Sequence, residues 1–163
     1  MRIPLICTSL ALLAPPVHAQ HAHGEGKLDI AIDRERLSIS LELPLDAAIG
    51  FERAPKTEKE KAALAAAARA VADPALFQPT AAANCKTESP RVTLPEFGKA
   101  GGEQHADIEA LHEFRCANPA ALKSVETTLF KSFKRLYRLE ARRAGPGGQG
   151  AGRLTPKTPV IAW

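Results

Sequence analysis

The sequence has few cysteines and lacks several short motifs on which enzyme active sites are built. It has three cysteines, no GxSxG nucleophile motif, no HExxH motif and no glycine-rich phosphate loop leading into a helix. Its glycine-rich stretch at residues 145–150 precedes a strand-like pattern, so a turn explains it. We therefore expect that this protein is not an enzyme.

The sequence also lacks an apolar run long enough to span a bilayer. Residues 3–13 are apolar but too short for a stable anchor. Arg2 precedes this run, and Val17 and Ala19 are small residues at the positions that a signal peptidase reads. We predict a signal peptide at residues 1–19, followed by a single domain at residues 20–163 that is exported to the periplasm without stable membrane insertion.

Cleavage after Ala19 would leave two cysteines, Cys85 and Cys116. An even pair in an exported protein favours a disulfide, which would stabilise the fold by about 3–4 kcal/mol in the chain-entropy model. The alternative is that both thiols ligate a metal, although no CxxC pair is present. A disulfide removes both thiols as nucleophiles.

The excess of positive charge is small. A net charge of +4 is too low and too dispersed to indicate a nucleic-acid partner. The densest basic run lacks the interleaved aromatic residues of a single-strand binder, and we interpret it as the solvated outer face of a strand. This run contains Lys131, Lys134, Arg135, Arg138, Arg142 and Arg143.

Apolar and polar residues alternate along several segments, which is typical of strands with one buried face. Residues 28–32 and 37–43 predict a hairpin, and residues 107–116 predict a strand with Cys116 on its buried side. Residues 125–133 are interpreted as a second core strand, pinned beside 107–116 by the disulfide. Shorter strands are expected at 91–94, 137–142, 150–154 and 160–163.

One segment predicts a helix. Thr57 and Glu60 have capping-box spacing, and the alanine-rich run from Glu58 to Ala72 favours helix. Together these segments predict an α+β fold, mainly antiparallel β-sheet with one main helix, pinned by one disulfide.

The histidines are the candidate metal ligands. His21 and His23 are two residues apart, so an extended chain places both imidazoles on the same side, as a chelating pair requires. His105 lies in a polar segment between Glu103 and Asp107. Imidazole and carboxylate ligands suit zinc, with copper and nickel as competitors. The alternatives are a solvated N-terminus for the pair and an ordinary loop position for His105.

Several separate stretches resemble the ZrgA-like proteins, an exported family linked to zinc uptake in Gram-negative bacteria. The resemblance covers nearly the whole predicted mature chain, in short motifs that keep their order and spacing. The matching stretches are HAHG at 21–24, the hairpin ending at 43–44, GFERAP at 50–55, the helix from Thr57, Cys85, the run from HADIEA to FRCANPAAL at 105–122, LFKSF at 129–133 and GQGAGRLTPKTP at 148–159.

The resemblance implies a periplasmic zinc-binding accessory protein that helps deliver zinc to an importer, with the zinc-binding protein of an ABC importer as a partner. It implies His21, His23 and His105 as zinc contacts, with Glu103 and Asp107 as helpers.

The chain departs from the family pattern at three places. The family's His/Asp/Glu-rich insert is reduced to residues 101–105, and Arg53 stands where the family tends to have histidine. His112 stands where an aromatic residue is common. It lies on the apolar face of residues 107–116, and we predict a core histidine.

Two other functions remain open from the sequence. One is a non-catalytic envelope interaction module that has lost metal binding. The other is a copper site at the mature N-terminus, where the free amine of His21 would chelate with His23 if cleavage fell after Gln20. The peptidase pattern favours Gln20 as the first residue.

Overall fold

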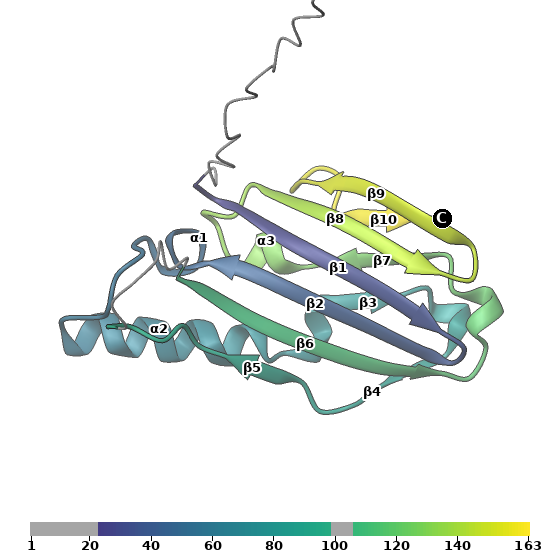
Figure 1. Cartoon of the computed structure of the whole chain (residues 1–163), viewed down its shortest axis with the longest axis horizontal. Coiled ribbons are helices and arrows are strands. Elements are labelled where there is room, and N and C mark those ends of the chain that lie inside the picture. The colour runs from purple at the N-terminus through teal and green to yellow at the C-terminus, as the bar shows by residue number, and fades with distance from the viewer. Residues whose placement is uncertain (1–22, 99–105) are drawn as a thin grey trace, which may run out of the picture.

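The structure, a computed structural model, describes residues 23–98 and 106–163, and a large β-sheet dominates it (Figure 1). In these residues seven strands form this sheet in the order β4-β6-β2-β1-β8-β9, with β5 also paired to β6. Only the β1–β8 pair is parallel among the pairings described. The strands are β1 (Glu25–Asp33), β2 (Arg36–Pro44), β4 (Cys85–Thr87), β5 (Arg91–Thr93), β6 (Asp107–Cys116), β8 (Arg138–Gly145) and β9 (Gly148–Leu154).

The large sheet buries one face and exposes the other. Leu28 and Ile30 of β1 are buried, whereas Lys27 and Ala31, on the opposite face, are exposed. The exposed face, turned toward the viewer in Figure 1, carries cross-strand ion pairs such as Asp29 with Arg142. The alternation in the sequence therefore marks the two faces correctly.

A second layer covers the buried face. It contains a three-stranded sheet in the order β10-β7-β3 and the main helix, α2 (Figure 1). Its elements are α2 (Glu58–Val71), β3 (Phe77–Pro79), β7 (Ser124–Thr127), α3 (Leu129–Ser132) and β10 (Val160–Ala162). Single 3-10 turns occur at Pro74–Leu76, Ala81–Ala83 and Pro119–Ala121. The predicted α+β class, mainly antiparallel with one main helix and one disulfide, is confirmed.

Helix α2 begins at the predicted capping box. Thr57 Oγ1 accepts a hydrogen bond from the Glu60 amide at 3.2 Å, and the Glu60 carboxylate accepts one from the Thr57 amide at 3.2 Å. Leu64, Ala67 and Val71 form the buried stripe of the helix. No helix in the described residues is both long enough and apolar enough to cross a bilayer.

His112 is a core histidine, as predicted. It is fully buried on β6, its Nε2 lies 2.9 Å from the Val71 carbonyl oxygen, and its ring meets Phe77 edge-on at 5.0 Å. Its Nδ1 is buried and has no hydrogen-bond partner within the described chain. Burial lowers the pKa of His112, so the neutral imidazole is the form that fits this core.

The interpretation of residues 125–133 as one strand beside 107–116 is wrong. The strand β7 ends at Thr127 and lies in the small sheet, while Leu129 begins the short helix α3. The Thr127 hydroxyl accepts a hydrogen bond from the Leu129 amide at 3.2 Å, which helps to turn the chain. Val125 and Leu129 are both buried, although one lies in a strand and the other in a helix. Their apolar side chains therefore give the same alternation in the sequence as a single strand would.

The basic run is only partly the exposed face of a strand. Arg138 and Arg142 lie on the outer face of β8 and pair with Glu25 and Asp29. Arg143 points inward, where it is 8% exposed, donates to the Gly148 carbonyl at 3.0 Å and stacks on Trp163. The remaining basic residues of the run precede β8.

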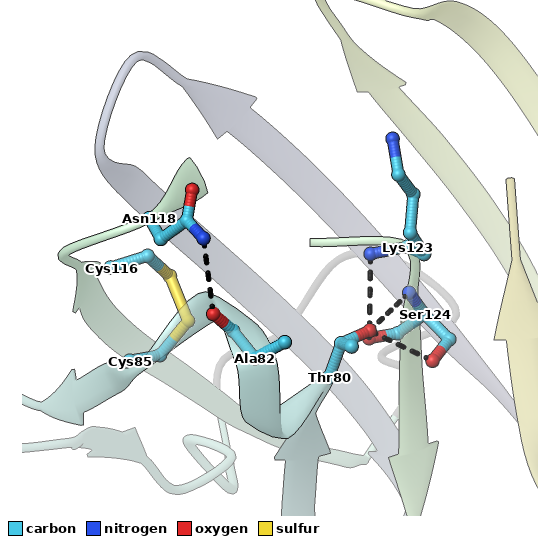
Figure 2. The surroundings of a disulfide bond; sticks show 7 residues. All are labelled: Thr80, Ala82, Cys85, Cys116, Asn118, Lys123 and Ser124. Carbon is cyan, nitrogen blue, oxygen red and sulfur yellow. Dashed lines mark hydrogen bonds between the residues drawn. A yellow bond between two sulfur atoms is a disulfide. The ribbon is translucent and has the colours of Figure 1, made fainter. Parts of the chain in front are cut away.

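The disulfide joins β4 to the end of β6 (Figure 2). Cys85 and Cys116 are register partners in the sheet, with Cα atoms 3.8 Å apart. Beside it, Asn118 Nδ2 donates to the Ala82 carbonyl at 3.3 Å, and Thr80 Oγ1 accepts from the Ser124 amide at 2.9 Å. The predicted Cys85–Cys116 bond is confirmed, and hydrogen bonds reinforce the corner around it.

Candidate metal centre

The candidate site lies at one end of the large sheet, where β1, β6 and β8 begin and β2 ends (Figure 1). His23 is two residues before β1, and Asp46 lies in the short helix α1 (Leu45–Ile49) that follows β2. Glu52 lies in the loop after α1. Because β1 and β2 are antiparallel, the start of one and the end of the other meet at this edge.

Three side chains that can ligate a metal come together there. One ligand atom from each of His23, Asp46 and Glu52 lies within 4.8 Å of the other two. The His23 side chain is 82% exposed and that of Asp46 is 16% exposed. They open into a hollow of about 440 Å³, whose lining side chains are His23, Asp46, Phe51, Glu52, Arg135 and Tyr137. We call this space the hollow.

Asp46 is the fixed part of the cluster. Its Oδ2 accepts a hydrogen bond from the Gly24 amide at 2.9 Å and lies 3.1 Å from His23 Nδ1. Its Oδ1 is buried and has no hydrogen-bond partner within the described residues. A buried carboxylate oxygen without a donor is costly unless something else, such as a cation, satisfies it.

The loop that carries Glu52 is tied down at both sides. Gly50 ends α1 in the left-handed conformation (φ +92°), and its amide donates to the carbonyls of Asp46 at 3.0 Å and Leu45 at 3.1 Å. On the other side, Arg53 donates to both Glu60 oxygens, at 2.6 and 3.0 Å, and its guanidinium stacks on Phe51.

Arg53 therefore joins this loop to the first turn of α2. The hydrogen bonds that Glu60 accepts from Arg53, and from the Lys56 and Thr57 amides, lower the pKa of Glu60 to about 2. Glu60 consequently stays ionised and keeps its bidentate pair with Arg53 over the whole neutral range. Arg53 thus positions the Glu52 loop and is engaged outside the cluster.

Tyr137 forms a wall of the hollow, and its polar end is already occupied. Its hydroxyl donates to Glu25 Oε1 at 3.1 Å, and Arg138 pairs with the same carboxylate. Arg138 lowers the pKa of Glu25, and burial together with Glu25 raises the pKa of Tyr137. Tyr137 therefore stays a neutral phenol that supports the wall.

The three side chains fit a zinc ion in type. Zinc accepts imidazole nitrogen and carboxylate oxygen at about 2.0–2.2 Å, so two ligand atoms on one ion lie at most about 4.4 Å apart. The ligand atoms lie within 4.8 Å of one another, so small movements would bring them to the distances that one ion requires. His23 and Glu52 are exposed and able to move, whereas Asp46 is held. Three protein ligands would leave one position open.

The structure describes two of the five metal ligands expected from the sequence. His23 belongs to the cluster. Asp107 is the first residue of β6, opposite Pro44 on β2, and does not belong to it. His21, Glu103 and His105 lie outside the described residues, so their roles stay predictions.

Sequence reasoning missed Asp46 and Glu52. Asp46 was hidden because it follows Pro44 in a segment that has no metal-ligand spacing to any histidine. Glu52 lies in the GFERAP stretch, where nothing in the motif marks it as a metal ligand. The available signal is their position in the chain. Both carboxylates follow β2, and β2 pairs antiparallel with β1, the strand that follows His23.

The fold and the hollow define a disulfide-pinned α+β protein with a histidine–carboxylate cluster at one end of its main sheet. A family model described as "ZrgA family zinc uptake protein" matches residues 20–163. The chain therefore belongs to this family, and the suspected resemblance is confirmed. The family description assigns it a role in zinc uptake. No curated protein matches the chain.

Proposed function

We propose that this chain is a periplasmic zinc-binding accessory protein that takes up zinc at the hollow and helps pass it to an importer. The observation that carries the proposal is the convergence of His23, Asp46 and Glu52 in a member of a zinc uptake family. Zinc is the cargo here, and no catalytic step is proposed.

The partly buried Asp46 supplies a preorganised ligand. Because Gly24 and His23 already contact its Oδ2, the carboxylate does not have to be ordered when the ion arrives. A cation would give the buried Oδ1 the partner that it lacks among the described residues. Both features favour binding of a cation at this carboxylate.

The two exposed ligands suit release as well as capture. His23 and Glu52 reach the ion from the solvent side, so an acceptor protein has access to the open coordination position. A resident structural zinc, by contrast, is usually enclosed by four protein ligands. An open site of this kind suits a protein that passes its ion on.

Residues outside the described chain extend the proposal. His105 is bonded to Ala106, and Ala106 lines a second hollow together with Glu52. His21 precedes His23 by two residues. We therefore keep His21 and His105 as additional zinc ligands to be tested. Export to the periplasm is part of the proposal, supported by the sequence of residues 1–19.

Zinc titration by calorimetry tests this function. The mature protein, residues 20–163, is stripped with chelator and titrated with zinc, beside a His23→Ala/Glu52→Gln variant. We expect one site of micromolar affinity or tighter, weakened at least about tenfold in the variant, because losing even an outer-shell partner typically costs a metal site that much. A His21→Ala/His105→Ala variant measures the contribution of the other histidines.

Glu126→Gln is a matched control for charge, because Glu126 is exposed on β7, away from the hollow. Its zinc affinity should equal that of the unchanged protein. Absence of heat and of any zinc-dependent rise in melting temperature would contradict the proposal and favour an interaction module. Zinc binding that survives the His23/Glu52 variant but not the His21/His105 variant would reject the described cluster.

A further inference from the structure

Arg135 is an unexpected residue in a cation site. Its guanidinium lines the hollow with His23, Asp46 and Glu52, yet it forms no ion pair with any residue that the structure describes. The other arginines near this end are engaged: Arg53 with Glu60 and Arg138 with Glu25. Arg135 is therefore the basic group left to interact with the contents of the hollow.

Gly50 explains how Arg135 reaches this place. A Cβ built on Gly50 would lie 3.0 Å from Arg135 Nε and 3.2 Å from its Cζ. The guanidinium thus lies against the bare backbone of Gly50, the residue that joins the helix carrying Asp46 to the loop carrying Glu52. Gly50 is required twice, for its left-handed φ and for the space that Arg135 occupies.

The charges of the hollow do not balance with zinc alone. Asp46 and Glu52 bring two negative charges, and Arg135 brings one positive charge. A divalent ion therefore leaves the hollow with a net positive charge. One bound monoanion restores neutrality, and it also fills the coordination position that three protein ligands leave open.

We infer that the hollow binds the metal together with a carboxylate anion, which occupies the open coordination position and is held by Arg135. A guanidinium presents a planar fork of donors that matches the two oxygens of a carboxylate. One oxygen would ligate the metal while the guanidinium donates to the carboxylate. This inference rests on the proposed function, because it needs a metal at His23, Asp46 and Glu52.

The carboxylate has two possible sources with the same chemistry. It is either a small organic acid that accompanies zinc in solution or a glutamate or aspartate side chain of an acceptor protein. The hollow is open, and Tyr137 on its wall is 48% exposed, so neither source is sterically excluded by the described residues. The test therefore needs one probe for each source.

The experiment uses cobalt(II) as a spectroscopic substitute for zinc in the mature protein. Cobalt is added to stripped protein, and its visible bands are followed while acetate or N-acetylglutamic acid α-amide is added at constant ionic strength. We expect saturable changes in the bands. Arg135→Gln should weaken anion binding about ten- to hundredfold, the range for lost hydrogen bonds between charged groups, and change cobalt affinity much less.

Two further variants make the result specific. Arg135→Lys keeps the charge without the fork and should restore only part of the anion affinity. Lys134→Gln removes a neighbouring exposed charge that does not line the hollow, and its anion affinity should be unchanged. The two probes are then compared with each other. If acetate binds more tightly than the glutamate amide, the site is assigned to free organic acids. If the glutamate amide binds as tightly as acetate or more tightly, the site is assigned to a protein side chain.

The outcomes separate this inference from the proposed function. If cobalt binds but neither anion changes the bands, or if Arg135→Gln behaves like the unchanged protein or Lys134→Gln, the carboxylate inference is wrong and the metal site stands. If cobalt and zinc both fail to bind, the proposed function is wrong and the inference is overturned with it.

Discussion

The two ends of strand β6 differ in almost every respect. At its C-terminal end, Cys116 is bonded to Cys85, and the neighbouring Thr80 and Asn118 have their hydrogen bonds satisfied (Figure 2). At its N-terminal end lie the hollow, an unpartnered buried oxygen on Asp46 and exposed candidate ligands. Ten residues of extended chain separate these ends by about 30 Å.

The difference indicates a division of tasks within one sheet. The disulfide end is closed by a covalent bond and by local hydrogen bonds, so it contributes stability and leaves little to interact with. The hollow keeps two carboxylates close together and one oxygen unsatisfied, an arrangement that costs stability without a ligand. Stability and binding should therefore respond to different substitutions.

The largest effect is expected from removing the disulfide. Cys85→Ser with Cys116→Ser should lower the free energy of unfolding by about 3–4 kcal/mol, since it opens a loop whose cysteines are 31 residues apart. Zinc affinity of the folded protein should change less than about twofold, because the sites are far apart. Urea unfolding and zinc calorimetry measure the two quantities. A large loss of affinity would show that the two ends are coupled.

Asp46→Asn should produce the opposite pattern. The substitution keeps the shape of the side chain but removes the charge, so zinc affinity should fall about ten- to hundredfold. The stability of the metal-free protein should stay within about 0.5 kcal/mol or rise, because a repulsive carboxylate pair is removed. Denaturant unfolding with chelator present measures the stability of the metal-free protein. A loss of several kcal/mol in its free energy of unfolding would mean that Asp46 is mainly structural.

Thr80→Val tests whether hydrogen bonds close the disulfide corner. The Thr80 hydroxyl accepts from the amides of Lys123 at 3.0 Å and Ser124 at 2.9 Å, and valine leaves both amides unpaired. The free energy of unfolding should fall by about 1–2 kcal/mol, with zinc affinity unchanged. Thr158→Val, in an exposed turn, is the comparison and should cost less.

Arg53→Ala tests how the Glu52 loop is held. Without the Glu60 pair and the Phe51 contact, the loop has to be ordered when zinc binds, which should cost about 0.5–1 kcal/mol of binding free energy. Calorimetry should therefore show a few-fold weaker affinity. Arg91→Ala, which removes one of the two arginines paired with Glu113 on the outer face, should leave affinity unchanged. Equal effects of both substitutions would refute the positioning role.

The smallest effect is expected from mild acid, and it involves neither end. Burial lowers the pKa of His112 below the value of about 6.5 that it has in the unfolded chain. The unfolded chain therefore takes up more protons as pH falls below about 6.5, and stability decreases in that direction. His112→Phe should flatten the dependence between about pH 7 and about pH 6 in urea unfolding. An equal slope in both proteins would exclude His112 as its source.

The sequence predicts the local features of this fold well. The hairpin at 28–43, the capping box at Thr57 and the disulfide each depend on residues whose pattern or pairing is visible in the chain. The same is true of His112, whose neighbours in the alternation are apolar. In each case local geometry decides the outcome.

The features that the sequence did not predict depend on which segments meet. Nothing in the alternation at 137–142 indicates that β8 pairs in parallel with β1, yet this pairing brings Arg135 and Tyr137 beside Gly24. Asp46 and Glu52 reach His23 because β2 returns antiparallel along β1, which brings the residues that follow β2 back to the start of β1. The strand predicted at 125–133 is wrong because a short buried helix and a buried strand have similar patterns of apolar residues over so few positions.

The most direct test is a crystal structure of the zinc-loaded mature protein with anomalous data at the zinc absorption edge. The account predicts an anomalous peak in the hollow, within about 2.0–2.2 Å of ligand atoms from His23, Asp46 and Glu52. A peak held only by other residues, or zinc-loaded crystals without a peak in the hollow, would contradict the central claim that this end of the sheet binds the metal.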